Sequence, residues 1–213
     1  MCGNDGVKAL LARVGRVCGS HVPKVRDVFA GCLWQAVIDE LGSVFVKPAL
    51  EGSSLGMSRA DSATQLREAF DQAARFGRAV MAEQFVSGPE YTVAILGDRA
   101  LPSIRIDVSG EFYDFDAKYA AGGSQHILPA DIPEPVTLQA CDWAERAYRT
   151  INCRGVIRAD YRWDDKNGEL YMLEINTVPG MTATSLVPEQ ARFIGLSGEE
   201  LINHLLEKAQ CDD

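Results

Sequence analysis

The order of apolar and polar residues divides this chain into short helices and strands. Apolar residues recur at intervals of three and four in several segments, which indicates amphipathic helices. We predict helices over 6–15, 31–41, 61–76, 134–150 and 197–209. Gly42 is a stop signal for the second helix, and Asp61 or Ser62 is a cap for the third. Ser197 and Glu200 have capping-box spacing at the start of the last helix.

Short apolar runs bounded by Gly, Pro, Asn or Asp indicate β-strands between these helices. We predict strands over 43–48, 79–86, 91–97, 100–108, 111–115, 155–163 and 170–176. The last two are joined by DDKNG, a strong hairpin signal. Turns that contain glycine separate the strands between 91 and 115, so we expect antiparallel pairing there. Polar loops are expected over 49–58 and 116–132.

Composition limits the class of protein. The 213 residues, 46% apolar and 24% charged, suffice for one large domain or two small ones. No apolar run approaches the ~20 residues that a membrane span needs, and we expect no secretory signal at the N-terminus. The net charge of −9 disfavours nucleic acid as a partner. It remains compatible with small anions that are bound by local charge and backbone amides.

Cysteine and serine patterns disfavour two kinds of site. The six cysteines form no C-x-x-C pair, which argues against a zinc site or a redox dithiol. Scattered cysteines in a chain of this length are typical of reduced thiols in a cytoplasmic protein. No G-x-S-x-G elbow is present, and neither Ser53 nor Ser185 has a neighbouring base, so serine-hydrolase chemistry is disfavoured.

The predicted hairpin places polar residues at regular spacing on both of its strands. Arg158 and Asp160 are two residues apart, as are Glu174 and Asn176, so each pair shares one face of its strand. If the hairpin closes at its KNG turn, the two faces coincide. Two carboxylates and an amide oxygen are ligands that Mg²⁺ takes, and Arg158 suits an anion that develops charge. The alternative is a surface ion-pair network, which the apolar neighbours on both strands disfavour.

Two further segments are compatible with phosphate binding. Lys47 ends a strand before a Gly/Ser loop, which offers an ammonium group and backbone N–H groups, although no Walker A motif is present. Lys118 and Tyr119 begin the long glycine-containing loop, which could close on a bound anion and exclude water. The alternatives are a solvent-facing lysine and a solvated loop. Three phosphate- or metal-compatible clusters together favour a nucleotide enzyme.

Five stretches of the sequence carry a family resemblance. They read VKPALEGSSLGMS, EQFVSGPEYTVAIL, FYDFDAKY, RADYRW and LEINTVPGMTATSLVP. In this order they resemble D-alanine–D-alanine ligases, ATP-grasp enzymes of peptidoglycan synthesis, from about Val44 to the C-terminus. The resemblance implies an α/β (α+β) ATP-grasp fold with two lobes, about 1–87 and 88–213, and ATP held between them.

The resemblance also implies ligands for ATP and for two Mg²⁺ (or Mn²⁺) ions. Lys47 and Lys118 would contact the phosphates, and Glu90 would hold the ribose hydroxyls. Glu83 and the backbone of Phe85 and Val86 would hold adenine. The implied metal ligands are Asp160, Glu174 and Asn176.

The remaining implied roles concern the substrates. The backbone of Gly180 and the side chain of Arg158 would steady the tetrahedral intermediate. Ser53 and Tyr119 would position the substrate and the loop, and Ser185 with Leu186 would hold the carboxylate of the second D-alanine.

The chemistry implied by the family proceeds through an acylphosphate. ATP would phosphorylate the carboxylate of the first D-alanine, and the amine of the second would attack the product. Mg²⁺ and lysine would offset repulsion between the two anions, and closure of the 116–130 loop would protect the acylphosphate from water. The family is usually dimeric, which makes a homodimer possible.

The sequence departs from the family in its first 42 residues. The N-terminal domain whose glutamate orients the first D-alanine has no counterpart, and Lys8 in NDGVK is a candidate for the family's second phosphate lysine. One alternative is therefore a truncated Mg-ATP-binding chain without catalysis. Another is a ligase that accepts D-lactate or D-serine. His126 in the long loop is a candidate for acceptor choice, because histidine changes charge near neutral pH.

Overall fold

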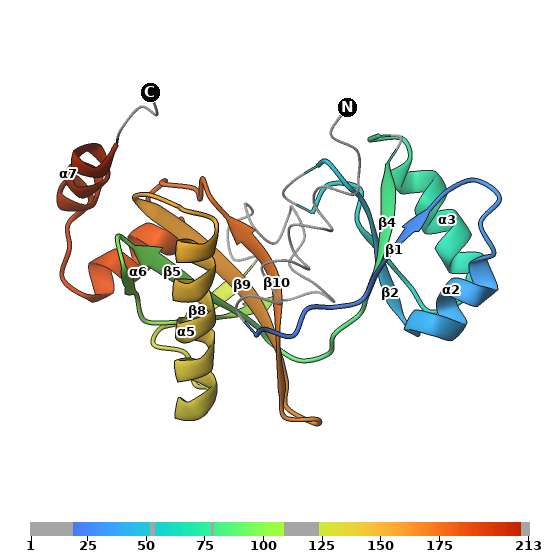
Figure 1. Ribbon diagram of the computed structural model, residues 1–213, viewed down its shortest axis with the longest axis horizontal. Helices are drawn as coiled ribbons and strands as arrows, with labels where there is room; N and C mark the ends of the chain where they lie inside the picture. Colours follow the sequence, from blue (N-terminus) through green and yellow to red (C-terminus); the bar gives the residue numbers. More distant parts are fainter. Residues whose placement is uncertain (1–18, 52–53, 78, 109–123, 210–213) are drawn as a thin grey trace. The chain divides into compact units, whose positions relative to one another are not determined.

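The computed structural model describes residues 19–51, 54–77, 79–108 and 124–209 as a mixed α+β protein with two antiparallel sheets (Figure 1). The chain divides into two compact units. Pro23–Ser87 forms the main part of the first. The second consists mainly of Gly88–Asp107 and residues 126–209, together with residues 19–22. The helix predicted over 6–15 and the strand predicted over 111–115 lie outside the described residues.

The described part of the first unit is a four-stranded sheet with two helices on one face. Its strand order is β1 (Val25–Val28), β4 (Val80–Gln84), β2 (Val44–Pro48) and β3 (Ser58–Ala60). The helices are α2 (Trp34–Leu41) and α3 (Ala63–Ala73). Val44, Val46 and Ala82 point from the sheet into the same apolar core as Leu66 of α3. Phe45 and Lys47 therefore lie on the opposite face, because side chains alternate along a strand.

Most of the local signals in this unit are confirmed. The N–H of Gly42 donates to the Ile38 carbonyl at the end of α2, with φ at +70°. The side chain of Ser62 caps α3 by accepting from the N–H of Gln65. Strands β1 and β3 were not predicted, because segments of four and three residues are too short to show a period.

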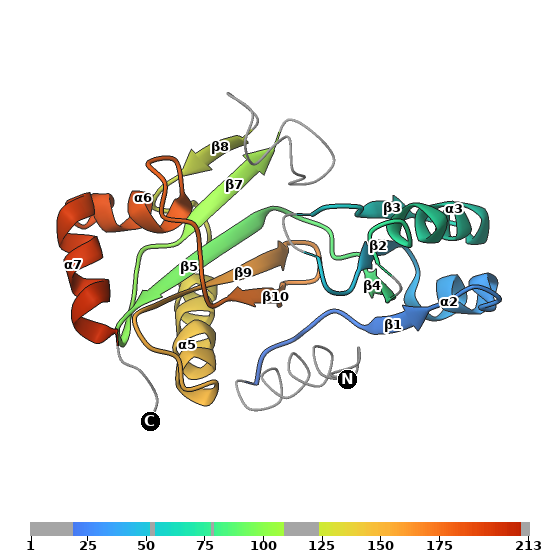
Figure 2. The same cartoon turned by 90° about the horizontal axis from the view of Figure 1, so that it is seen from above.

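Among the described residues, the second unit contains a larger sheet and three helices. Its strands run in the order β10 (Glu169–Asn176), β9 (Val156–Asp164), β5 (Glu90–Leu96), β7 (Ile104–Val108) and β8 (Ser124–Ile127), with β6 (Arg99–Ala100) beside β5. Figure 2 shows β7 and β8 on one side of β5, with β9 and β10 on the other. The helices are α5 (Glu134–Thr150), α6 (Leu186–Phe193) and α7 (Gly198–Lys208).

The two faces of this sheet have different environments. One face packs against α5 (Figure 1). Trp143 of the helix shares an apolar core there with Tyr91 and Tyr161 of the strands. On the opposite face, Ala94 of β5 shares a core with Val187 of α6 and with residues of α7. From Ala94 toward the start of β5, this second face becomes polar. The polar end contains the residues that the sequence predicted as metal ligands.

The structure corrects three expectations in this unit. The strand predicted over 100–108 is two strands, β6 and β7, separated by a segment that contains Pro102. The loop predicted over 116–132 contains β8. Helix α6 was not predicted, because it follows a run of small and hydroxyl residues and has Pro188 in its first turn, where proline is tolerated.

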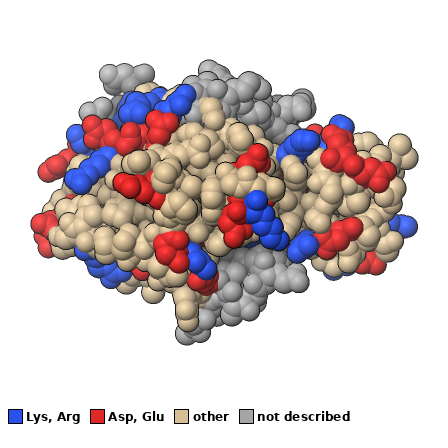
Figure 3. Space-filling view, turned by 90° about the horizontal axis from the view of Figure 1, so that it is seen from below, with Lys and Arg blue, Asp and Glu red and all other residues tan. Residues whose placement is uncertain are grey.

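The hairpin, α5 and the terminal helix are confirmed. Strand β9 pairs antiparallel with β10 across the DDKNG turn, and α5 covers the 17 residues from Glu134 to Thr150. Ser197 and Glu200 form both hydrogen bonds of the capping box. Among the described residues, no helix is long and apolar enough to cross a membrane. On the face shown in Figure 3, basic side chains lie beside acidic ones.

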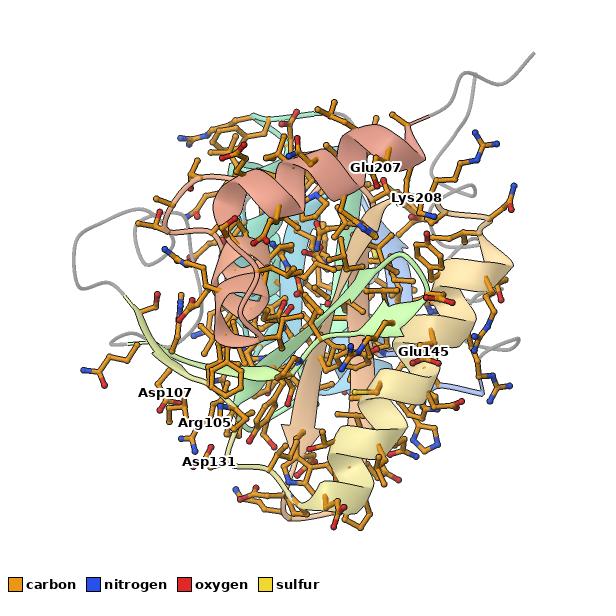
Figure 4. The ribbon with its side chains drawn as sticks, turned by 90° about the vertical axis from the view of Figure 1, so that its left-hand side faces the viewer. Arg105, Asp107, Asp131, Glu145, Glu207 and Lys208 are labelled. Carbon is orange, nitrogen blue, oxygen red and sulfur yellow. The ribbon has the colours of Figure 1, made fainter. Side chains whose placement is uncertain are left out.

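An ion-pair cluster connects β7 to the segment before α5. Arg105 Nε lies 2.7 Å from Asp107 Oδ1, and its Nη1 lies 3.0 Å from Asp131 Oδ2. Figure 4 shows these three side chains together. The hydrogen bond to the Asp107 carboxylate raises the pKa of Arg105 above its ordinary value, and the hydrogen bond to Asp131 adds to this effect. Arg105 lies opposite Tyr91 in the register of β7 and β5, and Tyr91 belongs to the core under α5. The cluster is therefore on the α5 face of the sheet, and the predicted metal ligands are on the other face.

Gly88 provides a test of how β5 begins. Its φ is +99°, and an added Cβ would lie 2.0 Å from the backbone oxygen of Trp163. We expect Gly88→Ala to lower the free energy of unfolding by about 2 kcal/mol or more, because both the conformation and the space require glycine. Gly77→Ala is the control, since an added Cβ there would meet nothing within 4 Å. Equal urea midpoints for the two variants would contradict this expectation.

Candidate functional site

The polar residues predicted on the hairpin do meet across it. In the register of β9 and β10, Glu174 lies opposite Asp160 and Asn176 lies opposite Arg158. All four side chains therefore project from the same face of the sheet. This confirms the expectation that closing the hairpin brings the two pairs together.

A β-bulge places Glu174 on this face. The pairing shifts between Met172 and Glu174, so that Met172 lies opposite Tyr161 whereas Glu174 lies opposite Asp160. Met172 and Tyr161 belong to the core under α5, on the other face. Leu173 is the extra residue of the bulge. Met172 and Glu174, which would share one face in a regular strand, therefore point to opposite faces of the sheet. The bulge was not visible in the sequence.

Asp160 is the centre of the site and is almost fully buried, with 5% of its surface exposed. Its two oxygens accept hydrogen bonds from Arg158 Nε at 2.8 Å and Arg158 Nη2 at 2.7 Å, the geometry of a bidentate pair. Thr92 Oγ1 on the neighbouring strand β5 donates to Asp160 Oδ1 at 2.7 Å. Burial of this carboxylate contradicts the alternative of a surface ion-pair network.

The environment holds Asp160 in its charged form. Burial, the largest single influence, acts to raise the pKa of its carboxyl. The positive charge and hydrogen bonds of Arg158, with smaller hydrogen-bond contributions from Thr92 and Glu174, together outweigh burial and hold the pKa below its ordinary value. Asp160 is therefore an anion at neutral pH. This is the state that a cation ligand requires.

Asn176 connects the two carboxylates. Its Nδ2 donates to Asp160 Oδ2 at 2.9 Å and to Glu174 Oε1 at 3.1 Å. Two carboxylates and one amide offer only hard oxygen ligands, which fits Mg²⁺ or Mn²⁺ and not a softer metal. Within the described part of the chain, no group of three or more His, Cys, Asp or Glu is arranged to hold a metal.

The first unit holds several of the residues assigned to ATP. Lys47 Nζ lies 3.0 Å from Glu83 Oε2, so the residues assigned to phosphate and adenine contact each other. The Phe45 and Phe85 rings meet edge to face, with centroids 5.3 Å apart. The N–H of Phe85 donates to the Ser43 carbonyl. Val86, the next residue, is buried.

Sequence reasoning missed two arginines, one in each unit, that contact residues assigned to ATP. Arg59 of β3 lies over the Phe85 ring, 4.3 Å from its centroid. Arg162 of β9 is opposite Glu90 in the register and pairs with it at 3.5 Å. Its position two residues after Asp160, on the same strand face, was a signal that could have identified Arg162. Arg59 and Thr92 have no such spacing from a predicted metal ligand on their own strands, so the sequence did not point to them.

The residues assigned to the second substrate gather at the start of α6. Ser185 Oγ accepts from the N–H of Thr182 at 3.1 Å and lies 2.8 Å from Thr182 Oγ1. A Cβ on Gly180 would lie 2.9 Å from the same hydroxyl, so glycine permits the close approach. Leu186 is the first residue of α6. The unpaired backbone N–H groups of a helix N-terminus favour a carboxylate.

Of the remaining predicted residues, three lie outside the described part of the chain and one is a histidine in the second unit. Ser53, Lys118 and Tyr119 lie outside the described residues. His126, expected in a loop, lies in β8, and its Nδ1 is 2.6 Å from Glu189 Oε2 on α6. The candidate for acceptor choice is thus in contact with the helix that begins at the predicted acceptor site.

The fold and the site together define a class: an α+β protein with two antiparallel sheets and a charged polar cluster built around the buried carboxylate of Asp160. Residues 32–207 match the family model described as D-ala D-ala ligase C-terminus. Because this match covers most of the sequence, the chain belongs to that family, as its motifs predicted.

Named relatives and solved structures agree with this membership. The chain is 48% identical over 167 residues to a D-alanine–D-alanine ligase of Rhodospirillum rubrum and 43% identical over 166 residues to one of Gluconobacter oxydans. These matches cover 78% and 77% of the chain. In each case the chain spans about half of the relative's length, 55%.

Crystal structures of ligases share the fold. The D-alanine–D-alanine ligase of Bacillus anthracis has a TM-score of 0.80 at 26% identity, with 96% of this chain and 68% of that one covered. Its complex with ATP has a TM-score of 0.77 at 25% identity, covering 96% and 67%. The VanG D-Ala:D-Ser ligase of Enterococcus faecalis has a TM-score of 0.77 at 26% identity, covering 96% and 62%.

The hydroxyl of Thr92 provides a test of the site's construction. Thr92 is fully buried. Thr92→Val keeps its shape but removes a hydrogen bond from a buried carboxylate, so we expect a loss of about 1–3 kcal/mol in the free energy of unfolding. Thr92→Ser, which keeps the hydroxyl, should recover most of the difference at neutral pH. Urea unfolding measures both, and equal losses would show that the methyl group matters instead.

Proposed function

We propose that this chain binds Mg²⁺-ATP and carries out the ATP-dependent joining of two D-alanines, the activity for which its relatives are named. The observation that carries this proposal is the convergence of Asp160, Glu174 and Asn176 beside Arg158, in a chain that is 48% identical to a named ligase. The ATP complex of a related ligase supports nucleotide binding by the fold. ATP lying between the two units is part of the proposal.

Asp160, Glu174 and the amide oxygen of Asn176 would hold the cation. For Asn176 this requires its amide to turn, because the nitrogen now faces both carboxylates. Bound Mg²⁺ would neutralise charge on the phosphates. Arg158 is held by both oxygens of Asp160, so its guanidinium is oriented before substrate binds. In that position it would stabilise the negative charge that develops on the reacting carboxyl group.

Lys47 and Lys118 would contact the phosphates, whereas Glu83, the backbone of Phe85 and Val86, and Glu90 would hold the nucleoside. The contact of Lys47 with Glu83 supports this assignment, because it places a positive charge at the end of β2. Ser53 and Tyr119 would position the substrate and the loop. Ser185, Leu186 and Gly180 would bind the carboxylate of the second D-alanine and the intermediate.

The proposed reaction has two steps. A carboxylate oxygen of the first D-alanine attacks the γ-phosphorus of ATP, and ADP leaves, which gives an acylphosphate. The amine of the second D-alanine then attacks the acyl carbon. The tetrahedral intermediate collapses with loss of phosphate and one proton, and a peptide bond remains.

Phosphate release tests the proposed activity. We expect the purified chain to release phosphate from ATP in the presence of Mg²⁺ and D-alanine, and to form D-alanyl-D-alanine detectable by mass spectrometry. Background phosphate release with Mg²⁺-dependent ATP binding would instead support a nucleotide-binding chain without catalysis. Absence of both would overturn the proposal.

Calorimetry with Glu174→Gln tests the metal ligands without requiring turnover. We expect Mg²⁺-dependent ATP affinity to fall about tenfold or more, because a charged ligand is lost. Glu169→Gln is a matched control: it makes the same change on the same strand, where Glu169 hydrogen-bonds to Tyr171 and lies opposite Asp164, away from the site. Equal affinities of the two variants would contradict the assignment of Glu174.

The second amino acid deserves a direct comparison, because the fold is equally similar to a D-Ala:D-Ser ligase. Turnover should be measured with D-alanine, D-serine and D-lactate as acceptors for the wild type and for His126→Ala. We expect D-alanine to be preferred, as the curated relatives' names indicate. A change of preference in His126→Ala would show that the contact with Glu189 influences acceptor choice.

A further inference from the structure

Gln190 is a polar residue in an apolar environment. It lies in α6 and is fully buried, with the neighbouring Val187 and Ala191 packed in the core between helix and sheet. Its Nε2 donates to the carbonyl oxygen of Pro102 at 2.9 Å and to that of Thr92 at 3.3 Å. Its Oε1 has no hydrogen-bond partner among the residues that the structure describes.

Stability alone does not account for this amide. A buried oxygen without a partner is unfavourable, and an apolar side chain of similar size would fill the same space without it. The amide instead provides directional hydrogen bonds. One NH₂ group donates to two backbone oxygens, one in β5 and one in the segment between β6 and β7, and so fixes where α6 lies on the sheet.

The two ends of this connection lead to two parts of the proposed site. Thr92, whose carbonyl accepts from Gln190, also donates its hydroxyl to Asp160. The first turn of α6, which precedes Gln190, contains Leu186 and follows Ser185. Gln190 therefore connects the strand that supports the metal ligand to the helix that begins at the acceptor site.

We propose that Gln190 is a positioning residue that holds the N-terminus of α6 in register with β5, and so places the acceptor next to the reacting carboxyl group. Its acceptor role rests on the proposed function, whereas its hold on α6 does not. The residue would not touch the substrate. Its effect would come through the position of Ser185 and Leu186.

Hydrogen exchange of Gln190→Met tests the hold on α6 without any need for activity. Methionine keeps the volume but cannot donate, so two hydrogen bonds are lost and an unpaired oxygen is removed. Amides of α6 should exchange about tenfold faster, as the loss of two bonds of ordinary strength implies, while α7 is unchanged.

Steady-state kinetics tests the acceptor role. For Gln190→Met we expect the KM for the second D-alanine to rise about tenfold, while the KM for ATP stays within about twofold. Leu201→Val is the matched control, because it loosens the same core from α7 and touches neither carbonyl. It should leave both KM values unchanged.

The outcomes separate this inference from the proposed function. Faster exchange confined to α6 together with a selective rise in the acceptor KM supports it. Unchanged exchange, or equal effects from Leu201→Val, overturns it. If the wild type shows no turnover, the proposed function fails, and exchange alone decides whether Gln190 positions α6.

Discussion

The buried carboxylate of Asp160 is the constraint on which the site depends. An ionised carboxylate inside a protein is stable only if charge and hydrogen bonds replace the water it has lost. Its partners come from three strands: Thr92 from β5, Arg158 from β9 and Asn176 from β10. The register of these strands and the charge of the site are therefore coupled, and a shift in either pairing would remove one of the hydrogen bonds that the carboxylate accepts.

The same sheet separates structure from chemistry by its two faces. The face under α5 is a continuous apolar core that includes Tyr161 and Met172. The opposite face is apolar only where α6 and α7 cover it, and polar at its other end. A single bulge lets β10 serve both, since Met172 contributes to the core and Glu174 to the site.

Helix α6 has a position that joins these regions. Its start contains the residues assigned to the acceptor, Glu189 contacts His126 of β8, and Gln190 contacts the backbone of β5. These contacts fix the helix from two sides. The membership in the ligase family agrees with this arrangement, although the chain spans 55% of the length of its curated relatives.

Local pattern in the sequence was sufficient for much of this protein. The two-residue spacing of Arg158 with Asp160 and of Glu174 with Asn176, and the glycine turn between their strands, predicted a shared face. Capping residues located α3 and α7, and the motifs identified the family. These features depend on neighbours along the chain, which is why a sequence reveals them.

Only the tertiary structure decided the bulge at Leu173, the short strands β1 and β3, and the place of α6. It also decided the partners of Asp160 and Gln190, since Thr92 is 68 and 98 residues away from them in sequence. Periodicity describes which face a residue occupies within one element. It does not describe which distant backbone oxygen or hydroxyl that face meets, because this depends on how strands and helices pack together.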